Sequence, residues 1–196
     1  KRAGISLRYS QGFNPHPRMS FAQPLSLGYS SFFELLEFET EEAQDLQSMA
    51  ERLAAALPEG LELLYCKTFD EPVKSLAAAA EAARYEIWLP LSAITAEDLR
   101  QKIDGYLGQA EIIAEKRQKK TKNMIMVDIK RQIRSFSGRV EEDSIVFDTL
   151  LDCGSLSNVS PELVIATFLA YSGWQLKRYQ IEVIRTQLLF SNNLQF

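Results

Sequence analysis

A segment near the start of the chain gathers cationic, aromatic and turn-forming residues within a short span, residues 7–21. Pro15 and Pro17 fix φ and remove backbone donors on both sides of His16, and Gly12 can supply a positive-φ turn, so a rigid loop is expected. Guanidinium and imidazole donors beside aromatic rings suit phosphate contact and base stacking. We therefore expect a ligand-binding loop that uses Arg8, Tyr9, Gln11, Gly12, Phe13, Asn14, His16 and Arg18.

Two other interpretations of this loop stay open at this point. In the structural one, Phe13 and Phe21 fill the core, the prolines route the chain and His16 bonds a backbone carbonyl. In the catalytic one, His16 performs acid–base chemistry near neutral pH, as in RNA-cleaving enzymes of the ferredoxin-like type. No Ser/His/Asp or Cys/His spacing supplies a partner, and Tyr9 and Ser10 are the only nearby hydroxyls. We therefore assign no catalytic residue.

A second cationic segment lies in the later part of the chain. Residues 116–139 contain nine Lys or Arg and a single acid, Asp128, which we expect to be a local ion-pair partner. Lysines at a hairpin tip neutralise phosphates without reading bases, and such binding depends strongly on salt. Alternatives are a solvated hairpin that protects a sheet edge from aggregation, or a surface for an acidic protein. The expected nucleic-acid contacts are Lys116, Arg117, Lys119, Lys120, Lys122, Lys130, Arg131 and Arg134.

Composition excludes several classes of protein. With one histidine and only Cys66 and Cys153 as cysteines, the chain cannot build a zinc, haem or iron–sulfur site from its usual ligands, so we expect neither metal nor cofactor in it. Both cysteines are expected to be buried small apolar residues. No apolar run approaches the roughly 18 residues that span a bilayer, so no membrane partner is expected. Low cysteine usage and the lack of a signal-like segment predict a cytoplasmic location.

The first half of the chain, residues 1–74, has the pattern of an incomplete α+β domain. Lys1 to Gly4 is typical of a helix end, with basic residues followed by a glycine cap, and the helix body would lie upstream. The expected elements that follow are a strand over 5–9, a loop over 10–27, a strand over 32–40, a helix capped by Thr40 and ending before Pro58, and a strand over 61–69. Alanine-rich residues 75–83 are expected to be a partly helical linker.

The second half, residues 84–196, begins a new series of elements. We expect strands over 85–91, 109–115, 123–129, 144–151 and 178–189, with helices starting at Thr95 and Pro161. The order predicts an α+β fold of two tandem ferredoxin-like (β-α-β-β-α-β) halves, the first lacking its opening strand and helix. One sheet face would stay free for a partner. A single larger α+β sheet is the alternative. Arg185 and Thr186 interrupt an apolar strand and are expected to pair with acidic residues or to lie at the domain boundary.

Several segments together resemble a known bacterial family of uncharacterised function, the radical-SAM-linked or radical-SAM-associated proteins. The most specific is the loop from Tyr9 to Ala22, and the others are shorter. They are Pro24 to Gly28, Lys119 to Lys122 with Val127 to Ile129, Ser160 to Glu162, and Ile184 to Leu189. The resemblance extends over nearly the whole chain, since these segments lie between Tyr9 and Leu189.

The resemblance implies a partner. Members of that family occur fused behind a radical SAM domain or beside a separate radical SAM protein. The iron–sulfur cluster and S-adenosylmethionine would belong to that partner, because the cluster needs three cysteines and this chain has two. We therefore expect a non-catalytic accessory or substrate-binding module that works with a radical SAM enzyme and binds RNA for modification. A pure protein-interaction scaffold is the alternative.

Overall fold

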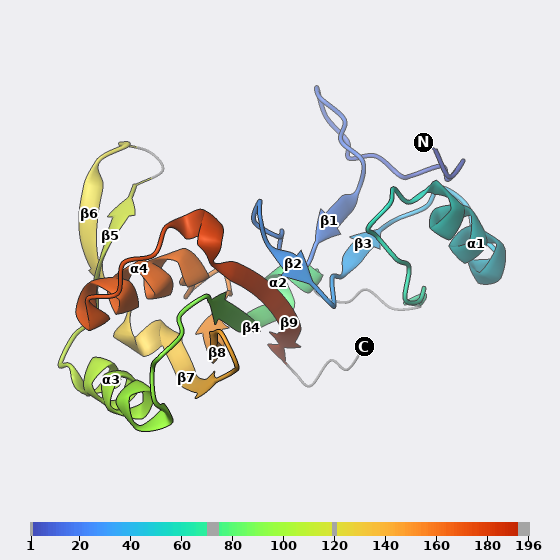
Figure 1. Cartoon of the computed structure of the whole chain (residues 1–196). Helices are drawn as coiled ribbons and strands as arrows, with labels where there is room; N and C mark the ends of the chain where they lie inside the picture. Colours follow the sequence, from blue (N-terminus) through green and yellow to red (C-terminus); the bar gives the residue numbers. More distant parts are fainter. Residues whose placement is uncertain (1, 70–74, 119–120, 192–196) are drawn as a thin grey trace. The chain divides into compact units, whose positions relative to one another are not determined.

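The computed structural model describes residues 2–69, 75–118 and 121–191 and divides into two compact units (Figure 1). Unit 1 comprises Lys1–Ala22 and Leu35–Leu76, and unit 2 comprises Gln23–Glu34 and Ala77–Phe196. The boundary therefore differs from a simple split at 75–83. A strip of the N-terminal part, residues 23–34, belongs to unit 2 although the residues on both sides of it belong to unit 1.

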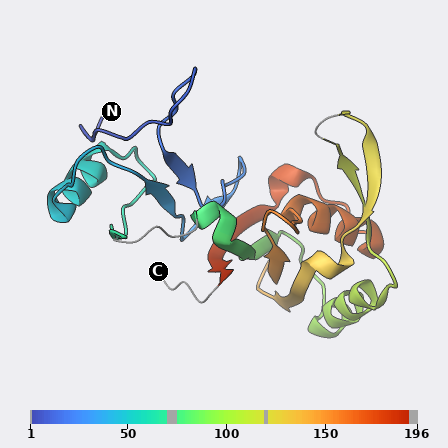
Figure 2. The same cartoon turned by 180° about the vertical axis from the view of Figure 1, so that it is seen from behind.

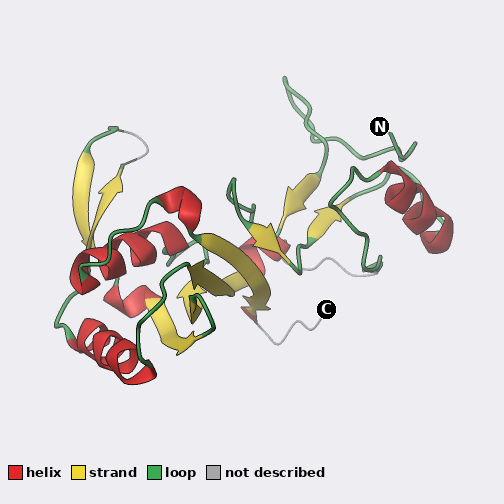
Figure 3. Cartoon of the chain, in the orientation of Figure 1, coloured by secondary structure: helices red, strands yellow, loops and turns green. Residues whose placement is uncertain are grey.

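Unit 2 is built on a five-stranded sheet. Its spatial order is β2 (Ser30–Ser31), β9 (Glu182–Phe190), β4 (Ala80–Leu89), β8 (Ile145–Asp152) and β7 (Ile133–Val140). The last four strands pair with one another in antiparallel fashion, whereas β2 pairs with β9 in parallel. The four antiparallel strands of this sheet and two of the helices drawn red in Figure 3, α3 (Ala96–Gly108) and α4 (Pro161–Ser172), follow one another along the chain in the order β4-α3-β7-β8-α4-β9. That is a split β-α-β-β-α-β connection.

The core of unit 2 lies between the sheet and these two helices. Tyr106 of α3 and Phe168 of α4 lie with ring centroids 5.1 Å apart, and Phe136 stacks on Phe147 at 4.7 Å on the sheet. Each such ring pair adds about 0.5–1.5 kcal/mol beyond the burial of apolar area. Thr95 accepts the N–H of Asp98 at the start of α3, as the sequence predicts. The core thus holds both helices against the sheet.

Two strands of the second half form a separate hairpin. β5 (Ile113–Arg117) and β6 (Met124–Asp128) pair only with each other, and this hairpin extends away from the sheet in both views (Figures 1 and 2). The short 3₁₀ helix Lys130–Gln132 then leads into β7, a strand that the sequence did not predict. The reason is that β7 is a polar edge strand in which only Phe136 is buried.

Residues 75–83 are not a linker. They form α2 (Leu76–Ala79) and the first residues of β4, in which Ala82 and Ala83 are fully buried between β8 and β9. Alanine favours helices intrinsically, but pairing on both sides overrides that preference here. The final strand starts later than expected, because Arg178–Gln180 is a 3₁₀ helix.

Unit 1 contains a two-stranded antiparallel sheet of β1 (Met19–Phe21) and β3 (Leu36–Phe38) and the helix α1 (Leu46–Ala56). Asp45, rather than Thr40, caps α1. Residues 61–69 are not in a strand, and residues 5–9 make only isolated bridges. Within its described residues unit 1 therefore lacks a second β-α-β-β-α-β sheet, so the fold is mixed α+β and the tandem arrangement is not confirmed. No described helix is both long and apolar enough to cross a bilayer.

Candidate functional site

The loop of residues 7–18 in unit 1 is a closed turn braced by hydrogen bonds at its base. The N–H of Ser10 donates to the carbonyl of His16 at 2.8 Å, and the N–H of His16 donates to Oγ of Ser10 at 3.0 Å. The N–H of Arg18 donates to the carbonyl of Arg8 at 2.8 Å. Reciprocal bonds across the neck, together with the two prolines, hold the loop in one shape.

The tip of this loop points its side chains into solvent. Phe13 is 105% exposed relative to its reference state, and Gln11, Gly12, Asn14 and His16 are exposed as well. Phe21 is 48% exposed. The interpretation of Phe13 and Phe21 as core residues is therefore wrong. The tip is a protruding surface with a bare aromatic ring, which suits stacking against a flat partner.

The two arginines of the loop are partly neutralised. Nη1 of Arg18 donates to both carboxylate oxygens of Glu39 at 3.0 and 3.1 Å, and Nη1 of Arg8 donates to the same carboxylate at 3.4 Å. Sequence reasoning did not identify Glu39 as their partner. All three side chains are about half exposed, and ion pairs of this kind contribute little to stability. A phosphate can therefore compete with Glu39 for either guanidinium.

The basic hairpin of unit 2 carries most of the second group of cations. Lys116, Lys122 and Arg131 are exposed and make no ion pair or side-chain hydrogen bond within the described residues. Arg117 is also exposed, and its Nε donates to the carbonyl of Lys122 at 3.2 Å. Lys119 and Lys120 lie outside the described residues. The hairpin thus presents Lys116, Arg117 and Lys122 on one projecting element, and Arg131 lies in the 3₁₀ helix that follows it.

Two of the cations that the sequence assigned to nucleic-acid binding make hydrogen bonds within unit 2 instead. Nζ of Lys130 donates to the carbonyl of Gln109, and Nε of Arg134 donates to the carboxylate of Asp152, which is 9% exposed. Because their donors are committed to internal partners, Lys130 and Arg134 contribute less to a phosphate-binding surface than their charges suggest.

Asp128 also acts within the fold. Its Oδ1 accepts the backbone N–H of Lys130 at 3.0 Å and that of Ile112 at 2.9 Å, and these bonds lower the pKa of its carboxyl group. The carboxylate ties the base of the hairpin to the preceding segment. Its main role is thus that of a backbone hydrogen-bond acceptor. The positive charges of Arg131 and Lys130 lower its pKa further, as expected for an acid among cations, but no side-chain ion pair forms with them.

The sheet face opposite the helices in unit 2 carries paired charges. Arg84 donates to Asp148 at 2.6 Å, and Arg139 donates to Glu86 at 3.3 Å while lying 5.9 Å from the ring centroid of Trp88. Acids and bases alternate across neighbouring strands, so this face lacks the one-sided positive charge that attracts a phosphate backbone. The cationic hairpin fits a nucleic acid better than the sheet does.

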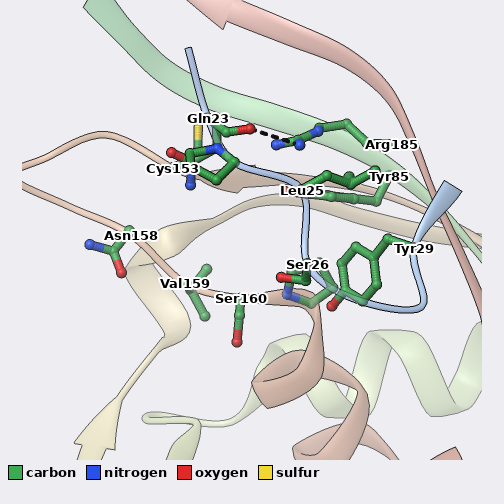
Figure 4. A pocket seen from close by; sticks show the side chains of 12 residues that line it. Gln23, Leu25, Ser26, Tyr29, Tyr85, Cys153, Asn158, Val159, Ser160 and Arg185 are labelled. Atoms are coloured by element: carbon green, nitrogen blue, oxygen red, sulfur yellow. Dashed lines mark hydrogen bonds between the residues drawn. The ribbon is translucent and has the colours of Figure 1, made fainter. Parts of the chain in front are cut away.

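A pocket of unit 2 joins segments that are distant in sequence (Figure 4). Residues 23–26 and Tyr29, the turn before α4, and Arg185 line it. Arg185 pairs with Glu34, as expected for an arginine that interrupts an apolar strand. Sequence reasoning missed the pocket, although three short segments that carry the family resemblance meet there: Pro24 to Gly28, Ser160 to Glu162, and Ile184 to Leu189.

The two cysteines are unpaired thiols that differ in burial. Cys153 is buried, as expected, while Cys66 is only partly buried, and both are free thiols. Burial raises the pKa of the Cys153 thiol to about 11, which keeps it protonated at neutral pH. No group of three or more metal-ligating side chains occurs in the part of the chain that the structure covers.

The chain matches a known family of proteins. The family model described as "Uncharacterized protein conserved in bacteria (DUF2344)" matches residues 1–161. This span includes the loop, the basic hairpin and all of the pocket lining except Arg185. No curated protein matches the sequence.

Proposed function

The chain belongs to the family of uncharacterised proteins conserved in bacteria (DUF2344), and on this premise we propose that it is a cytoplasmic, non-catalytic accessory module that binds RNA for a radical SAM enzyme. The projecting β5–β6 hairpin carries the RNA-binding part of the proposal. Its exposed cations Lys116 and Lys122, and Arg131 of the 3₁₀ helix that follows the hairpin, make no ion pair or side-chain hydrogen bond within the described residues. Cations of this kind release counterions when they bind a phosphate backbone.

The loop of unit 1 supports the same proposal with different chemistry. Phe13 is a fully exposed ring on a turn that hydrogen bonds already hold in place. Little conformational entropy of the protein is therefore lost when a base stacks on this ring. Arg8 and Arg18 lie at the base of that turn and share one carboxylate. Aromatic stacking combined with nearby guanidinium groups is typical of proteins that bind single-stranded RNA.

The architecture of unit 2 also fits this role. Its β-α-β-β-α-β connection and antiparallel four-stranded core support a ferredoxin-like assignment for this unit. In this proposal the domain is a rigid platform: the sheet face with paired charges stays unused and the hairpin contacts RNA.

The radical SAM partner rests on the family resemblance of the loop and the shorter segments. The partner would hold the cluster and S-adenosylmethionine, and this chain would hold the substrate. A binding titration between this chain and a purified radical SAM protein of the same bacterium tests that part. If RNA strengthens the binding between the two proteins, the result supports the proposal. If the chain binds the radical SAM protein but has no affinity for RNA, it is a pure interaction scaffold.

RNA binding is tested by fluorescence anisotropy with a labelled single-stranded RNA over a range of salt concentrations. The triple variant Lys116→Ala, Lys122→Ala, Arg131→Ala should bind more weakly at low salt. The slope of log K against log salt should fall by about 2, since each phosphate contact on a single strand contributes about 0.7.

The matched control removes the same number of charges elsewhere: Lys67→Ala, Arg100→Ala, Lys177→Ala, all exposed. This variant should keep the wild-type slope. Equal loss in both triple variants would show that only net charge matters, and wild-type protein that binds no RNA at low salt would refute the proposal.

A further inference from the structure

The β5–β6 hairpin projects from the sheet of unit 2 (Figure 1), and its two faces differ. In its antiparallel register Ala114 lies opposite Val127, and Glu115 lies opposite Met126. Opposed residues share a face of the pair, and neighbours along a strand lie on different faces. Ala114 is 2% exposed, and its strand lies against α4. The face that contains Ala114 is therefore the inner face, and the face that contains Met126 is the outer face.

The outer face presents apolar side chains to solvent. Ile113, Met124 and Met126 lie on it and are 44%, 53% and 67% exposed. The solvated face of an antiparallel pair is normally polar, because leaving apolar area in water costs free energy. Methionine side chains are flexible and polarisable, and they suit a surface that adapts to a partner. The outer face thus has the chemistry of a contact surface.

The charges of the hairpin divide along its length. Lys116, Arg117 and Lys122 lie near the tip, between the end of β5 and the start of β6. Lys116 and Lys122 make no ion pair or side-chain hydrogen bond within the described residues. Farther from the tip, the outer face carries the acids Glu115 and Asp128. Phosphate groups are therefore attracted to the tip and repelled from the rest of the outer face, so an uncharged group fits beside the methionines.

A single strand of RNA combines both kinds of group. Its phosphates are anionic, whereas its bases are uncharged and can turn out of the stack to expose their flat faces. The sulfur of methionine makes favourable contacts with aromatic rings, and the carboxylate of Glu115 can accept hydrogen bonds from the amino groups of bases. A duplex hides its base faces, so it would leave the apolar area of the outer face unmatched.

We propose that the outer face of the hairpin binds unpaired bases on Met124 and Met126, while the cations at the tip hold the adjoining phosphates. This inference rests on the RNA binding proposed above and adds a substrate class to it. The hairpin selects single-stranded RNA over duplex RNA.

The methionine methyl groups provide a direct test, because the chain has only four methionines. The full chain, labelled with ¹³C at these methyl groups, is titrated at low salt with a short RNA made of A and C, which cannot pair with itself. The signals of Met124 and Met126 should move upfield, because their methyl groups enter the ring currents of the bases, and the shifts should saturate. The signal of Met49, which is buried on α1, should stay in place. The same RNA annealed to its complement should leave the Met124 and Met126 signals unmoved.

A double variant tests the energetic role of the two methionines. Met124→Thr with Met126→Thr removes the thioethers and keeps a residue that favours strands. Its affinity for the unpaired RNA should fall roughly five-fold, while its affinity for the duplex and its salt dependence should not change. Leu27→Thr with Leu156→Thr is the matched control, since both leucines are fully exposed in unit 2 outside the hairpin, and it should bind as wild type does.

The outcomes separate this inference from the proposed function. If the wild type binds unpaired RNA and duplex equally well, or if the double methionine variant keeps the wild-type affinity for unpaired RNA, the inference is overturned and RNA binding still stands. If the wild type binds neither RNA, the proposed function itself is wrong. Methyl signals of Met124 and Met126 that move with protein concentration alone would show that a second copy of the chain covers the outer face, which would also overturn the inference.

Discussion

Arg185 and Glu34 are separated by 151 residues in the sequence and form a two-point ion pair inside unit 2, with nitrogen–oxygen distances of 2.8 and 3.0 Å. The Arg185 side chain is 1% exposed and that of Glu34 27%. Next to this pair, the N–H of Phe32 donates to the carbonyl of Arg185 at 3.0 Å, in line with the parallel β2–β9 pairing. Backbone and side-chain bonds together fasten residues 23–34 to unit 2.

Glu34→Gln should destabilise unit 2, because it leaves the buried Arg185 charge without a counter-charge. Losing one partner of a buried pair costs about 3–5 kcal/mol, and the partial exposure of Glu34 places the expected loss near the lower end. Urea unfolding followed by tryptophan fluorescence measures it. Glu182→Gln is the control, since Glu182 is exposed on β9 and makes no ion pair within the described residues. If both variants unfold at the same urea concentration, the pair does not contribute to stability.

The elements of unit 2 that the sequence predicted correctly are those marked by residues close together in the chain. Helices α3 and α4 were found because Thr95 and the Ser160-Pro161 pair mark helix starts. The sequence predicted an acidic partner for Arg185 but did not identify it as Glu34. The reason is that the parallel pairing of β2 with β9 joins segments that are far apart in the chain. Strand β7 was missed, because an edge strand that buries mainly Phe136 carries almost no apolar alternation.

For the candidate sites, too, the sequence predicted features that depend on a short segment and missed contacts between distant segments. The exposure of the loop tip followed from its Pro, Gly and Asn content, but the bonds from Arg8 and Arg18 to Glu39 depend on the β1–β3 pairing that brings Glu39 beside the loop. The pocket combines Tyr85, Ser160 and Arg185 from three elements. No spacing within one segment could reveal it, since sheet order decides which strands lie together.

Phe13→Ala should weaken RNA binding without changing stability. A base stacked on an aromatic ring contributes about 1–3 kcal/mol, which is roughly a 5-fold to 150-fold change in affinity. The fully exposed Phe13 ring buries nothing in the free protein, so the melting temperature should stay the same. Anisotropy and thermal unfolding measure the two effects. Tyr179→Ala, at a ring that is 81% exposed in unit 2, should leave RNA affinity intact, and equal losses would argue against a specific role of the loop.

His16→Ala should not change the fate of RNA incubated with the protein. An accessory module leaves its substrate intact, so neither wild type nor variant should cleave a labelled RNA on a denaturing gel. The imidazole is exposed at the loop tip, and the backbone of His16, which braces the turn, is retained in the variant. Cleavage by wild type that disappears in His16→Ala would support the enzyme alternative instead.

Asp128 should make the base of the hairpin sensitive to acid. The N–H groups of Lys130 and Ile112 lower the pKa of its carboxyl group, so the ionised form is favoured in the folded protein. A lowered pKa contributes stability that is present above the unfolded-state value of about 3.9 and is lost as the pH falls through the lower folded value. Hydrogen exchange of these two amides, corrected for intrinsic rates, should show protection falling on acidification. Asp128→Asn should lack this pH dependence, and Asp143→Asn, at an exposed turn, should retain it.

Gly138 makes room for the aromatic core of unit 2. It lies opposite Phe147 in the β7–β8 register, and a Cβ there would lie 2.9 Å from atoms of both Ile103 and Phe147. Gly138→Ala should therefore push apart the Phe136–Phe147 stack and destabilise unit 2 by about 1–3 kcal/mol. Gly108→Ala is the matched control: nothing lies within 4 Å of its new Cβ, and alanine favours the helix by up to about 1 kcal/mol. Urea unfolding should thus give changes in the free energy of unfolding that have opposite signs for the two substitutions. If the Gly138→Ala protein is as stable as wild type, the added methyl group does not disturb the packing of Phe136 on Phe147.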